Sequence, residues 1–388
     1  MRRPIYLDHH ATTPCDPRVV EAMAPYWSEE FGNASSATHA YGWRAEAAVE
    51  DARERLARAI GARDAREIVF TSGTTESDNL AIAGVVRAAM PARDHVVTSA
   101  VEHPAVLDAC RALANEGVRV SSLPVDSDGL VDPDEVARAI TPRTALVSVM
   151  AANSEIGVLE PIEAIGAICR ERGVPFHTDA AQAVGKVPVD VEWAHVDLLS
   201  MCAHKCYGPK GVGALYLRER QPRIAVAPLL HGGGHERGLR SGTLPVPLCV
   251  GFARALELCL AERESEASRL AALRDRLFER LEAIGARRNG HATRRLPGNL
   301  NVAIPGAPAD ALLVALRDVA LSTGSACASA RGEPSHVLRA IGLDPTLARS
   351  SVRFGLGRGT TAEEIETAAG RVIEEVGLLR QARRAGVA

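Results

Sequence analysis

A lysine at position 205 is the residue with the clearest chemical potential in this sequence. It lies within Leu198–Leu217, where one apolar run precedes it and a second follows a Gly/Pro turn. This pattern predicts a strand, a turn and a second strand, with Lys205 held where the first strand ends. A lysine in a packed, partly dry setting has a depressed pKa and becomes an amine nucleophile. A surface lysine in a hairpin loop is the alternative interpretation.

The segment Ser72–Ser77 has the composition of an anion site. It follows Glu67–Thr71, which has the character of a strand, and Gly73-Thr74-Thr75 then begins a predicted helix. The first N–H groups of a helix have no partners within it, so they attract an anion together with the helix dipole. The hydroxyls of Thr74 and Thr75 can add hydrogen bonds. Ordinary capping of the helix is the alternative.

An acid and an imidazole are predicted to meet the lysine at one edge of a sheet. Asp179 follows the predicted strand Pro175–Thr178, and His103 follows the predicted strand His95–Thr98. Ligands of doubly wound sheets bind at the carboxyl ends of the strands. A lysine, an acid and a phosphate-binding turn at this edge fit pyridoxal phosphate, because the acid can keep the pyridine nitrogen protonated. His103 is placed to cover the ring, although a lone histidine is more often structural.

A cysteine far along the chain is the remaining candidate for chemistry. Cys327 lies in Ser322–Glu333, which is built almost wholly of small residues. Such a segment has too little apolar bulk to pack firmly, so we expect a mobile surface loop. An exposed thiol has a pKa of about 8.5, and a nearby cation or helix N-terminus raises its thiolate fraction. An incidental buried cysteine is the alternative.

The elements that must position these residues alternate between strands and helices. This alternation predicts right-handed crossovers and a mostly parallel sheet covered by helices on both faces, which is an α/β fold. A long helix over about Pro247–Ile284 then leads to a smaller α+β part. We expect a large domain over residues 13–258 and a small domain formed by residues 1–12 with 259–388. Beyond the strands already given, those predicted are Val118–Leu123, Ala145–Val149, Asn299–Ile304, Ala320–Ser322 and Val352–Leu356.

Composition narrows the class of protein. The 388 residues are 46% hydrophobic and 24% charged, and the net charge is −3, so nothing favours nucleic acid or an anionic membrane as a partner. No apolar run approaches the ~18 residues of a membrane span, and the N-terminus has no signal-peptide pattern. The 8 cysteines form no Cys-x-x-Cys pair and indicate no metal site. We therefore expect a cytoplasmic protein with mostly reduced thiols.

Several long blocks of the sequence resemble the cysteine desulfurases. These pyridoxal phosphate enzymes take sulfur from L-cysteine for iron–sulfur clusters and thio-modification. The resemblance runs from Tyr6 to Phe354, and its blocks are Phe70–Asn79, His204–Gly211, His231–Gly238, Arg240–Thr243 and Gly324–Cys327. It implies fold type I of the pyridoxal phosphate enzymes. The stretch after Cys327 is similar to that of the branch with a long, mobile cysteine loop.

The resemblance also implies how the ring of the cofactor is held. Lys205 would bind the cofactor and move the Cα proton, while His103 would stack on the ring and help in proton transfer. Asp179 would pair with the ring nitrogen, and Gln182 would bond the ring hydroxyl. The Asn-Asn-Glu run of the family reads Asn-Ser-Glu here, which leaves Asn153 as the candidate amide near that hydroxyl.

The phosphate contacts follow from the same resemblance. Thr75, the amide of Thr74 and His204 would bind the phosphate, and Thr243 would reach the phosphate of the other subunit of a homodimer. Where the family usually has a phosphate-binding serine, this chain has Cys202, whose thiol is a weaker donor.

For the substrate, the resemblance implies three residues. Arg353 would pair bidentately with the carboxylate of L-cysteine, aided by Asn33 in a loop where Ala34 replaces a common proline. Cys327 would attack the substrate sulfur, leaving a persulfide on the enzyme and releasing alanine. The persulfide would pass to a sulfur-acceptor protein such as an iron–sulfur scaffold.

Two other functions remain open at this point. A selenocysteine lyase or an aminotransferase-like relative would keep the cofactor and change the reaction, although the Gly324–Cys327 block argues against an aminotransferase. A platform for a sulfur-relay complex, with catalysis lost, is disfavoured by the complete set of Lys205, Asp179, His103, Cys327 and Arg353.

Overall fold

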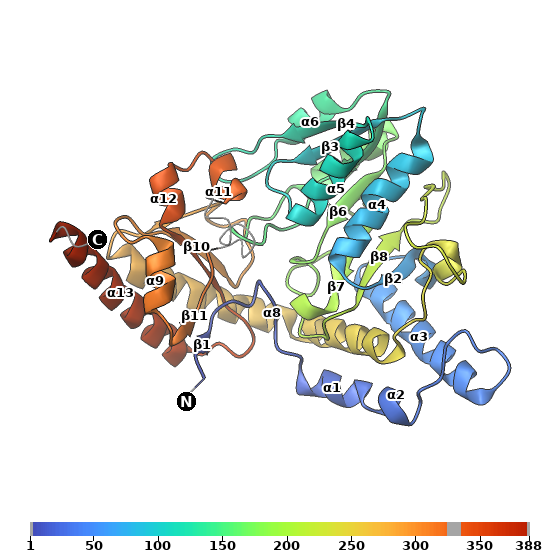
Figure 1. Cartoon of the computed structure of the whole chain (residues 1–388), viewed down its shortest axis with the longest axis horizontal. Coiled ribbons are helices and arrows are strands. Elements are labelled where there is room, and N and C mark those ends of the chain that lie inside the picture. The colour runs from blue at the N-terminus through green and yellow to red at the C-terminus, as the bar shows by residue number, and fades with distance from the viewer. Residues whose placement is uncertain (1–2, 324–334, 386–388) are drawn as a thin grey trace.

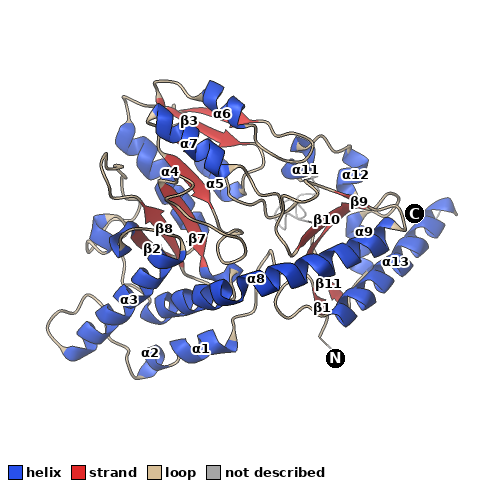
Figure 2. Ribbon diagram, turned by 180° about the vertical axis from the view of Figure 1, so that it is seen from behind, coloured by secondary structure: helices blue, strands red, loops and turns tan. Residues whose placement is uncertain are grey.

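The long helix α8 (Val246–Glu282) joins the two lobes of the molecule. In this computed structural model, residues 3–323 and 335–385 are described. Figures 1 and 2 show a larger lobe built on a broad sheet and a smaller lobe that contains both ends of the described chain. Cys327, and with it the prediction of a loop around it, lies outside the described residues.

The larger lobe is organised around a sheet of seven described strands in the order β2-β8-β7-β6-β5-β3-β4. β8 runs antiparallel to its neighbours β2 and β7, and the other strands are parallel to one another. The strands are β2 (Ile68–Thr71), β3 (His95–Ser99), β4 (Arg119–Leu123), β5 (Thr144–Ser148), β6 (Phe176–Asp179), β7 (Leu198–Cys202) and β8 (Gly213–Leu217).

Helices cover both faces of this sheet because successive apolar side chains of a strand point to opposite faces, and both faces are therefore apolar. Ile68 and Phe70 pack on one face with α3 (Ala40–Ala59) and α8, whereas Val69 packs on the other face with α4 (Thr74–Ala89) and α5 (Pro104–Asn115). The remaining helical elements of this lobe are α1 (Pro17–Met23), α2 (Pro25–Ser28), η1 (Ala65–Glu67), α6 (Pro133–Ala139), α7 (Ile162–Arg172), η2 (Ala203–Lys205) and η3 (Glu236–Gly238).

The smaller lobe has its own apolar core. An antiparallel sheet in the order β12-β10-β9 packs with the C-terminal half of α8 and with α13, which lie side by side in Figure 2. β1 pairs in parallel with β11, so the first residues of the chain belong to this lobe. The elements are β1 (Ile5–Tyr6), β9 (Arg287–Arg288), β10 (Asn299–Ala303), α9 (Ala309–Ala315), β11 (Val319–Ala320), α11 (His336–Ala340), α12 (Pro345–Arg349), β12 (Ser351–Gly355) and α13 (Ala362–Arg384).

The α/β fold class is confirmed, and the predicted strands lie within a residue or two of those observed. The sequence analysis did not predict β1, β9 or α12, which are short and have no clear periodicity. α8 continues through residue 258 without a break, and the domain division at that position stays a prediction. In the two described ranges, no helix has both the length and the hydropathy to cross a bilayer.

A buried ion pair fixes the segment that precedes α8 against the sheet. Arg53 Nη1 donates to Glu236 Oε2 at 2.8 Å, and Arg53 Nη2 donates to Glu236 Oε1 at 2.7 Å. The backbone N–H of Phe70 donates to the same carboxylate at 2.6 Å. Glu236 and Arg237 have φ values of 49° and 57°, a left-handed conformation that costs non-glycine residues about 1–3 kcal/mol. The ion pair therefore holds a strained turn in place.

We expect Glu236→Gln to destabilise the protein by about 3 kcal/mol, because it leaves the buried guanidinium of Arg53 without its full partner. Glu50→Gln is the matched control, since Glu50 also pairs with Arg53 but its side chain is 51% exposed, and its loss should cost under about 1 kcal/mol. Thermal unfolding of the three proteins under identical conditions measures the difference. Equal melting temperatures for the two variants would show that the buried pair does not hold the turn.

Candidate active site

Lys205 lies at the carboxyl end of β7, on the short 3-10 turn η2. Its amine donates to the carbonyl of His10 at 2.5 Å and to that of Ala11 at 2.8 Å. Burial lowers the pKa of Lys205, which raises the fraction of neutral, nucleophilic amine. Lys205 is thus a partly buried, bonded lysine, and the surface-lysine alternative is excluded.

The turn after Lys205 is held by contacts from distant parts of the chain. Tyr207 has a φ of 63°, a conformation that bulky residues rarely adopt. Its N–H donates to Thr13 Oγ1 at 2.8 Å, its hydroxyl accepts from the N–H of Arg358 at 2.6 Å, and the Arg358 guanidinium lies 4.2 Å from its ring centre. Thr13 Oγ1 also donates to the carbonyl of His204 at 2.9 Å. These contacts fix the backbone on both sides of Lys205.

Asp179 lies at the carboxyl end of β6, next to β7 in the sheet. It is buried, and its Oδ1 accepts from the N–H of Ala181 at 2.9 Å. Burial raises the pKa of Asp179, while His103 and Lys205 lower it. A buried carboxylate with nearby cations is suited to pair with a protonated pyridine nitrogen.

Other titratable groups behind Asp179 are held neutral. Burial raises the pKa of Asp78 well above its usual value and that of Glu102 to about 8. Burial lowers the pKa of His177 to about 3, and its Nε2 lies 3.6 Å from Asp78 Oδ1. Burial raises the pKa of Asp179 as well, but the neighbouring His103 and Lys205 act in the opposite direction and favour its charged form.

His103 is the N-cap residue of α5, and its Nδ1 accepts from the N–H of Ala105 at 3.2 Å. This bond places the proton of the neutral imidazole on Nε2. Desolvation by the surrounding protein lowers the pKa of His103, although the side chain is exposed. The ring is exposed, and its role in stacking on the cofactor stays a prediction.

The N-terminus of α4 has the properties of a phosphate site. Gly73 is its N-cap residue and provides no side-chain hydrogen bond, so the first N–H groups of the helix are uncapped. The hydroxyl of Thr74 is buried, finds no hydrogen-bond partner in the described ranges and lies beside the thiol of Cys202. The start of β8 packs closely against this turn, since a Cβ on Gly213 would lie 2.6 Å from Gly73 Cα. An orphaned hydroxyl beside uncapped N–H groups fits the phosphate of the predicted cofactor.

His204 borders this site, and its Nδ1 lies 3.2 Å from Thr12 Oγ1. Burial and the neighbouring Lys205 lower the pKa of His204 to about 4, so it is a neutral hydrogen-bonding group. Thr75 is exposed on the first turn of α4, and its carbonyl accepts from Asn79 Nδ2 at 2.8 Å. The orphaned Thr74, the uncapped helix, Asp179 and Lys205 together show that pyridoxal phosphate fits these residues.

Two amides assigned to the ring hydroxyl are occupied by protein contacts. Gln182 Nε2 donates to the carbonyl of His10 at 2.9 Å, and its Oε1 accepts from Lys186 Nζ at 2.7 Å. Asn153 Nδ2 donates to the carbonyl of Val101, and its Oδ1 accepts from the N–H groups of Glu155 and Ile156. Gln182 lies beside the backbone that holds Lys205, whereas Asn153 stabilises its own turn. Their contacts with a cofactor stay predictions.

Arg353 reaches the site from β12 of the smaller lobe. Its Nη2 donates to Asp8 Oδ1 at 2.7 Å, and its Nη1 donates to the carbonyl of Ser154 at 2.9 Å. The side chain is buried, and its charge contributes to lowering the pKa of Lys205. Asp8 and Ser154 thus orient a guanidinium beside the lysine, where it can bind the carboxylate of a small substrate.

Two other predicted residues are exposed on loops of the larger lobe. Asn33 is exposed on the loop between α2 and α3, and its Oδ1 accepts from the N–H of Ser35 at 2.9 Å. Thr243 is exposed on the segment between η3 and α8. Their roles toward substrate and phosphate stay predictions, as does the role of Cys327.

The sequence analysis missed the residues that hold Lys205 and Arg353. His10 and Ala11 act through backbone carbonyls, which leave no mark on residue type, and they lie 195 and 194 positions from Lys205. Asp8 is similarly remote from Arg353. No group of three or more metal-ligating side chains occurs among the residues described.

Comparisons with known proteins agree with this geometry. The family model of the class-V aminotransferases matches residues 5–367. The chain is 54% identical over 384 residues to a cysteine desulfurase IscS of Anaeromyxobacter sp. (strain Fw109-5), covering 98% of this chain and 94% of the relative. It is 53% identical over 381 residues to the mitochondrial cysteine desulfurase of Drosophila melanogaster, covering 98% and 82% of the two chains.

Solved structures show the same relationship. A NifS-like protein matches with a TM-score of 0.90 and 36% identity, covering 97% of this chain and 100% of that one. The structure of SspA in complex with cysteine matches with a TM-score of 0.82 and 38% identity, covering 91% and 98%. On its family model, its relatives and its fold, the chain belongs to the cysteine desulfurases of the class-V aminotransferase family.

Proposed function

We propose that this protein removes sulfur from L-cysteine and carries it as a persulfide on Cys327, with L-alanine as the other product. The observation that carries the proposal is the meeting of Lys205, Asp179 and Arg353 at one end of the sheet. The amine, the acid and the guanidinium match the aldehyde and nitrogen of pyridoxal phosphate and the carboxylate of an amino acid.

Each of these residues has its own role in the proposed reaction. Bound pyridoxal phosphate supplies an electron sink that stabilises negative charge at the substrate Cα. Arg353 orients the carboxylate, Lys205 Nζ accepts the Cα proton, and His103 donates a proton through Nε2. Cys327 attacks the substrate sulfur, so that an S–S bond forms and the C–S bond breaks. In total, the enzyme thiol and one L-cysteine are consumed, and one enzyme persulfide and one L-alanine are formed.

Both ends of the stretch that contains Cys327 are fixed beside this site. The N–H of Arg353 donates to the carbonyl of Ser322 at 2.7 Å, just before that stretch. Just after it, Ser335 Oγ donates to Glu155 Oε2 at 2.5 Å, and His336 Nε2 lies 2.9 Å from the carbonyl of Glu102. These anchors support a reaction between Cys327 and a substrate held by Arg353.

Replacing Cys327 by Ala should abolish alanine release from L-cysteine while the visible absorbance of the bound cofactor is kept. Lys205→Ala should lose that absorbance as well as the activity, because the amine binds the cofactor. Purified protein incubated with L-cysteine and a reductant, with alanine, sulfide and the spectrum measured together, provides the test. Unchanged alanine formation by Cys327→Ala would refute the persulfide role, and faster turnover on selenocysteine or on an amino donor with a keto acid would favour a different reaction.

Replacing Arg353 by Lys should raise the KM for L-cysteine by about 10- to 100-fold, because a point charge replaces a bidentate guanidinium. Steady-state kinetics measure the change, with kcat affected less than KM. Arg349→Lys, an exposed position on α12 of the same lobe, serves as the control and should leave KM unchanged. An unaltered KM in Arg353→Lys would mean that another group binds the carboxylate.

We further propose that the active unit is a homodimer. Large aromatic side chains are exposed near α2 and the start of α3: Trp27 (61%), Phe31 (63%), Tyr41 (46%) and Trp43 (55%). Aromatic residues are enriched in protein interfaces and are costly to leave in water. Their exposure, together with that of Thr243, supports a second copy that covers this surface and receives Thr243 at its phosphate site.

Mixed dimers provide the test of this shared site. Thr243→Ala should weaken cofactor binding about tenfold through loss of a hydrogen bond to a charged group. Lys205→Ala and Thr243→Ala subunits folded together should regain one intact site per dimer, because each contributes what the other lacks. The same two variants mixed as separately folded dimers are the control. Mixed dimers with no more activity than their parents would indicate sites confined to single subunits.

The persulfide must be discharged before the next turnover. We propose that a sulfur-acceptor protein, such as an iron–sulfur scaffold, accepts it, and the support is the 54% identity to a relative named cysteine desulfurase IscS.

A further inference from the structure

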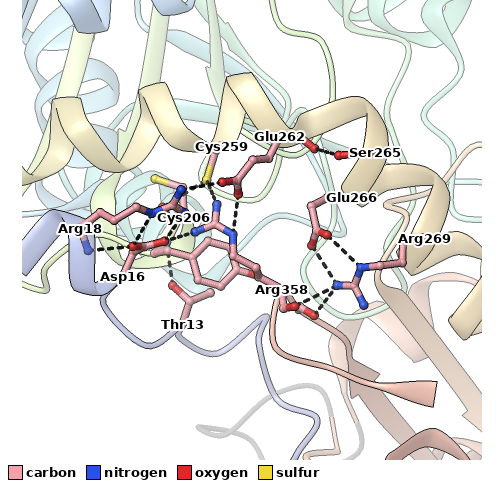
Figure 3. Close-up of polar contacts among 12 residues, drawn as sticks. Thr13, Asp16, Arg18, Cys206, Cys259, Glu262, Ser265, Glu266, Arg269 and Arg358 are labelled. Atoms are coloured by element: carbon pink, nitrogen blue, oxygen red, sulfur yellow. Dashed lines mark hydrogen bonds and ion pairs between the residues drawn. The ribbon is translucent and has the colours of Figure 1, made fainter. Parts of the chain in front are cut away.

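Two thiols next to Lys205 are not used by the proposed reaction. Cys206 follows Lys205 directly, and Cys259 lies on α8. Cys259 Sγ donates to the carbonyl of Cys206 at 3.3 Å, so the two residues are in direct contact. Gly185 flanks both, because a Cβ built there would lie 3.0 Å from Cys259 Cβ and 3.4 Å from Cys206 Cβ. Figure 3 shows Cys259 pointing from α8 toward Cys206 and Arg358.

The surroundings make the two sulfur atoms unequal. Arg358 Nη2 donates to the sulfur of Cys259 at 3.7 Å, whereas the thiol of Cys206 donates to the carbonyl of Ala203 at 3.2 Å. The contact with Cys206 and the nearby Arg358 and Lys186 lower the pKa of Cys259, despite its burial. The contact with Cys259 and burial raise the pKa of Cys206. Because a guanidinium beside the sulfur stabilises a thiolate, Cys259 is the nucleophile of the pair.

A small cavity gives access to the pair. Its volume is about 60 Å³, and Cys206, Cys259, Lys186, Tyr207 and Arg358 are among the residues that line it. A water molecule needs about 10–15 Å³ measured in this way, so the cavity holds a few molecules of that size. Hydrogen peroxide, which is about as large as two water molecules, fits. Glutathione, a tripeptide, does not.

We propose that Cys206 and Cys259 form a peroxide-reactive dithiol whose oxidation to a disulfide displaces Lys205 at the end of η2. The substrate class is a small hydroperoxide, with hydrogen peroxide as the best fit to the cavity.

The oxidation balances with peroxide as the only oxidant. The sulfur of Cys259 attacks one oxygen, an S–O bond forms, the O–O bond breaks, and the released hydroxide takes a thiol proton to become water. The sulfur of Cys206 then attacks that of Cys259, so that the S–S bond forms, the S–O bond breaks and a second water leaves with the other thiol proton. The two thiols lose two electrons in total, and one peroxide becomes two waters.

The direction of the Cys206 thiol in this structure explains why forming the disulfide would move Lys205. Its thiol is directed back along η2, 3.2 Å from the carbonyl of Ala203 and 3.6 Å from that of Cys202. A disulfide needs an S–S distance of about 2.0 Å and a Cβ–Cβ distance of about 3.5–4.5 Å. Forming it draws Cys206 away from these carbonyls toward α8. Lys205, the last residue of η2, must move with it.

The test uses the holoenzyme with Cys327→Ser, which removes the expected catalytic thiol as a competing target. Treatment with hydrogen peroxide should lower the intact mass by 2 Da and yield a proteolytic peptide that joins Cys206 to Cys259. Cofactor release, followed by its visible absorbance, should become at least fivefold faster. Glutathione disulfide should produce neither change, because it cannot enter the cavity.

Matched thiols and variants control for general oxidation. Cys249 lies on the same helix and is buried, but burial raises its pKa to about 12, so it should react at least tenfold more slowly than Cys259. Adding Cys206→Ser should stop the reaction at a Cys259 gain of 16 Da, with no crosslink and unchanged cofactor release. Equal oxidation of Cys249 and Cys259, absence of the crosslink, or a crosslink that leaves cofactor release unchanged would each overturn the proposal.

Discussion

The carbonyl of His10 is the contact on which the site depends. It accepts from the amine of Lys205 and from the amide of Gln182, and so joins two strand ends to a segment that crosses between the lobes. A lysine amine in a partly dry pocket needs acceptors, and backbone carbonyls provide them without adding a negative charge that would raise its pKa. The crossing segment thereby keeps Lys205 both bonded and reactive.

The same segment couples the two lobes electrostatically. Asp8, two residues before His10, orients Arg353 of the smaller lobe toward the larger one. The guanidinium is buried, and the carboxylate of Asp8 and the carbonyl of Ser154 are among the groups that compensate its charge. A buried charge of this kind stays in place only with well-formed partners. The position of the Arg353 guanidinium thus depends on the N-terminal residues as much as on β12.

Much of the site could be predicted because its residues lie at the ends of buried strands. Asp179 and Lys205 follow apolar runs, and Thr74 follows a strand that leads into a helix, which are local patterns. The carboxyl ends of parallel strands meet at one edge, so the strand positions place these groups together. The apolar character of the strands also explains why the α/β fold class was predictable.

The remaining features depend on contacts between remote residues. Nothing local in His10 shows that its carbonyl will meet Lys205, and the amide of Asn153 is taken up by a turn that only the fold reveals. β1 and β9 have two residues each, which is too few to show the alternation of apolar and polar residues that marks a strand. Cys202, marked in the sequence as a departure from the family, lies beside the orphaned hydroxyl of Thr74, so a thiol borders the N-terminus of α4.

The anchors on either side of the Cys327 stretch have a kinetic consequence. Ser322 is bonded to Arg353 and Ser335 to Glu155, so a sulfhydryl that the chain carries between these two anchors is tethered to the site. Confinement of this kind corresponds to an effective concentration of about millimolar or more. A free thiol in solution competes with Cys327 for the substrate sulfur only when its concentration exceeds this effective concentration. The tether therefore favours transfer of sulfur to the protein over transfer to small thiols.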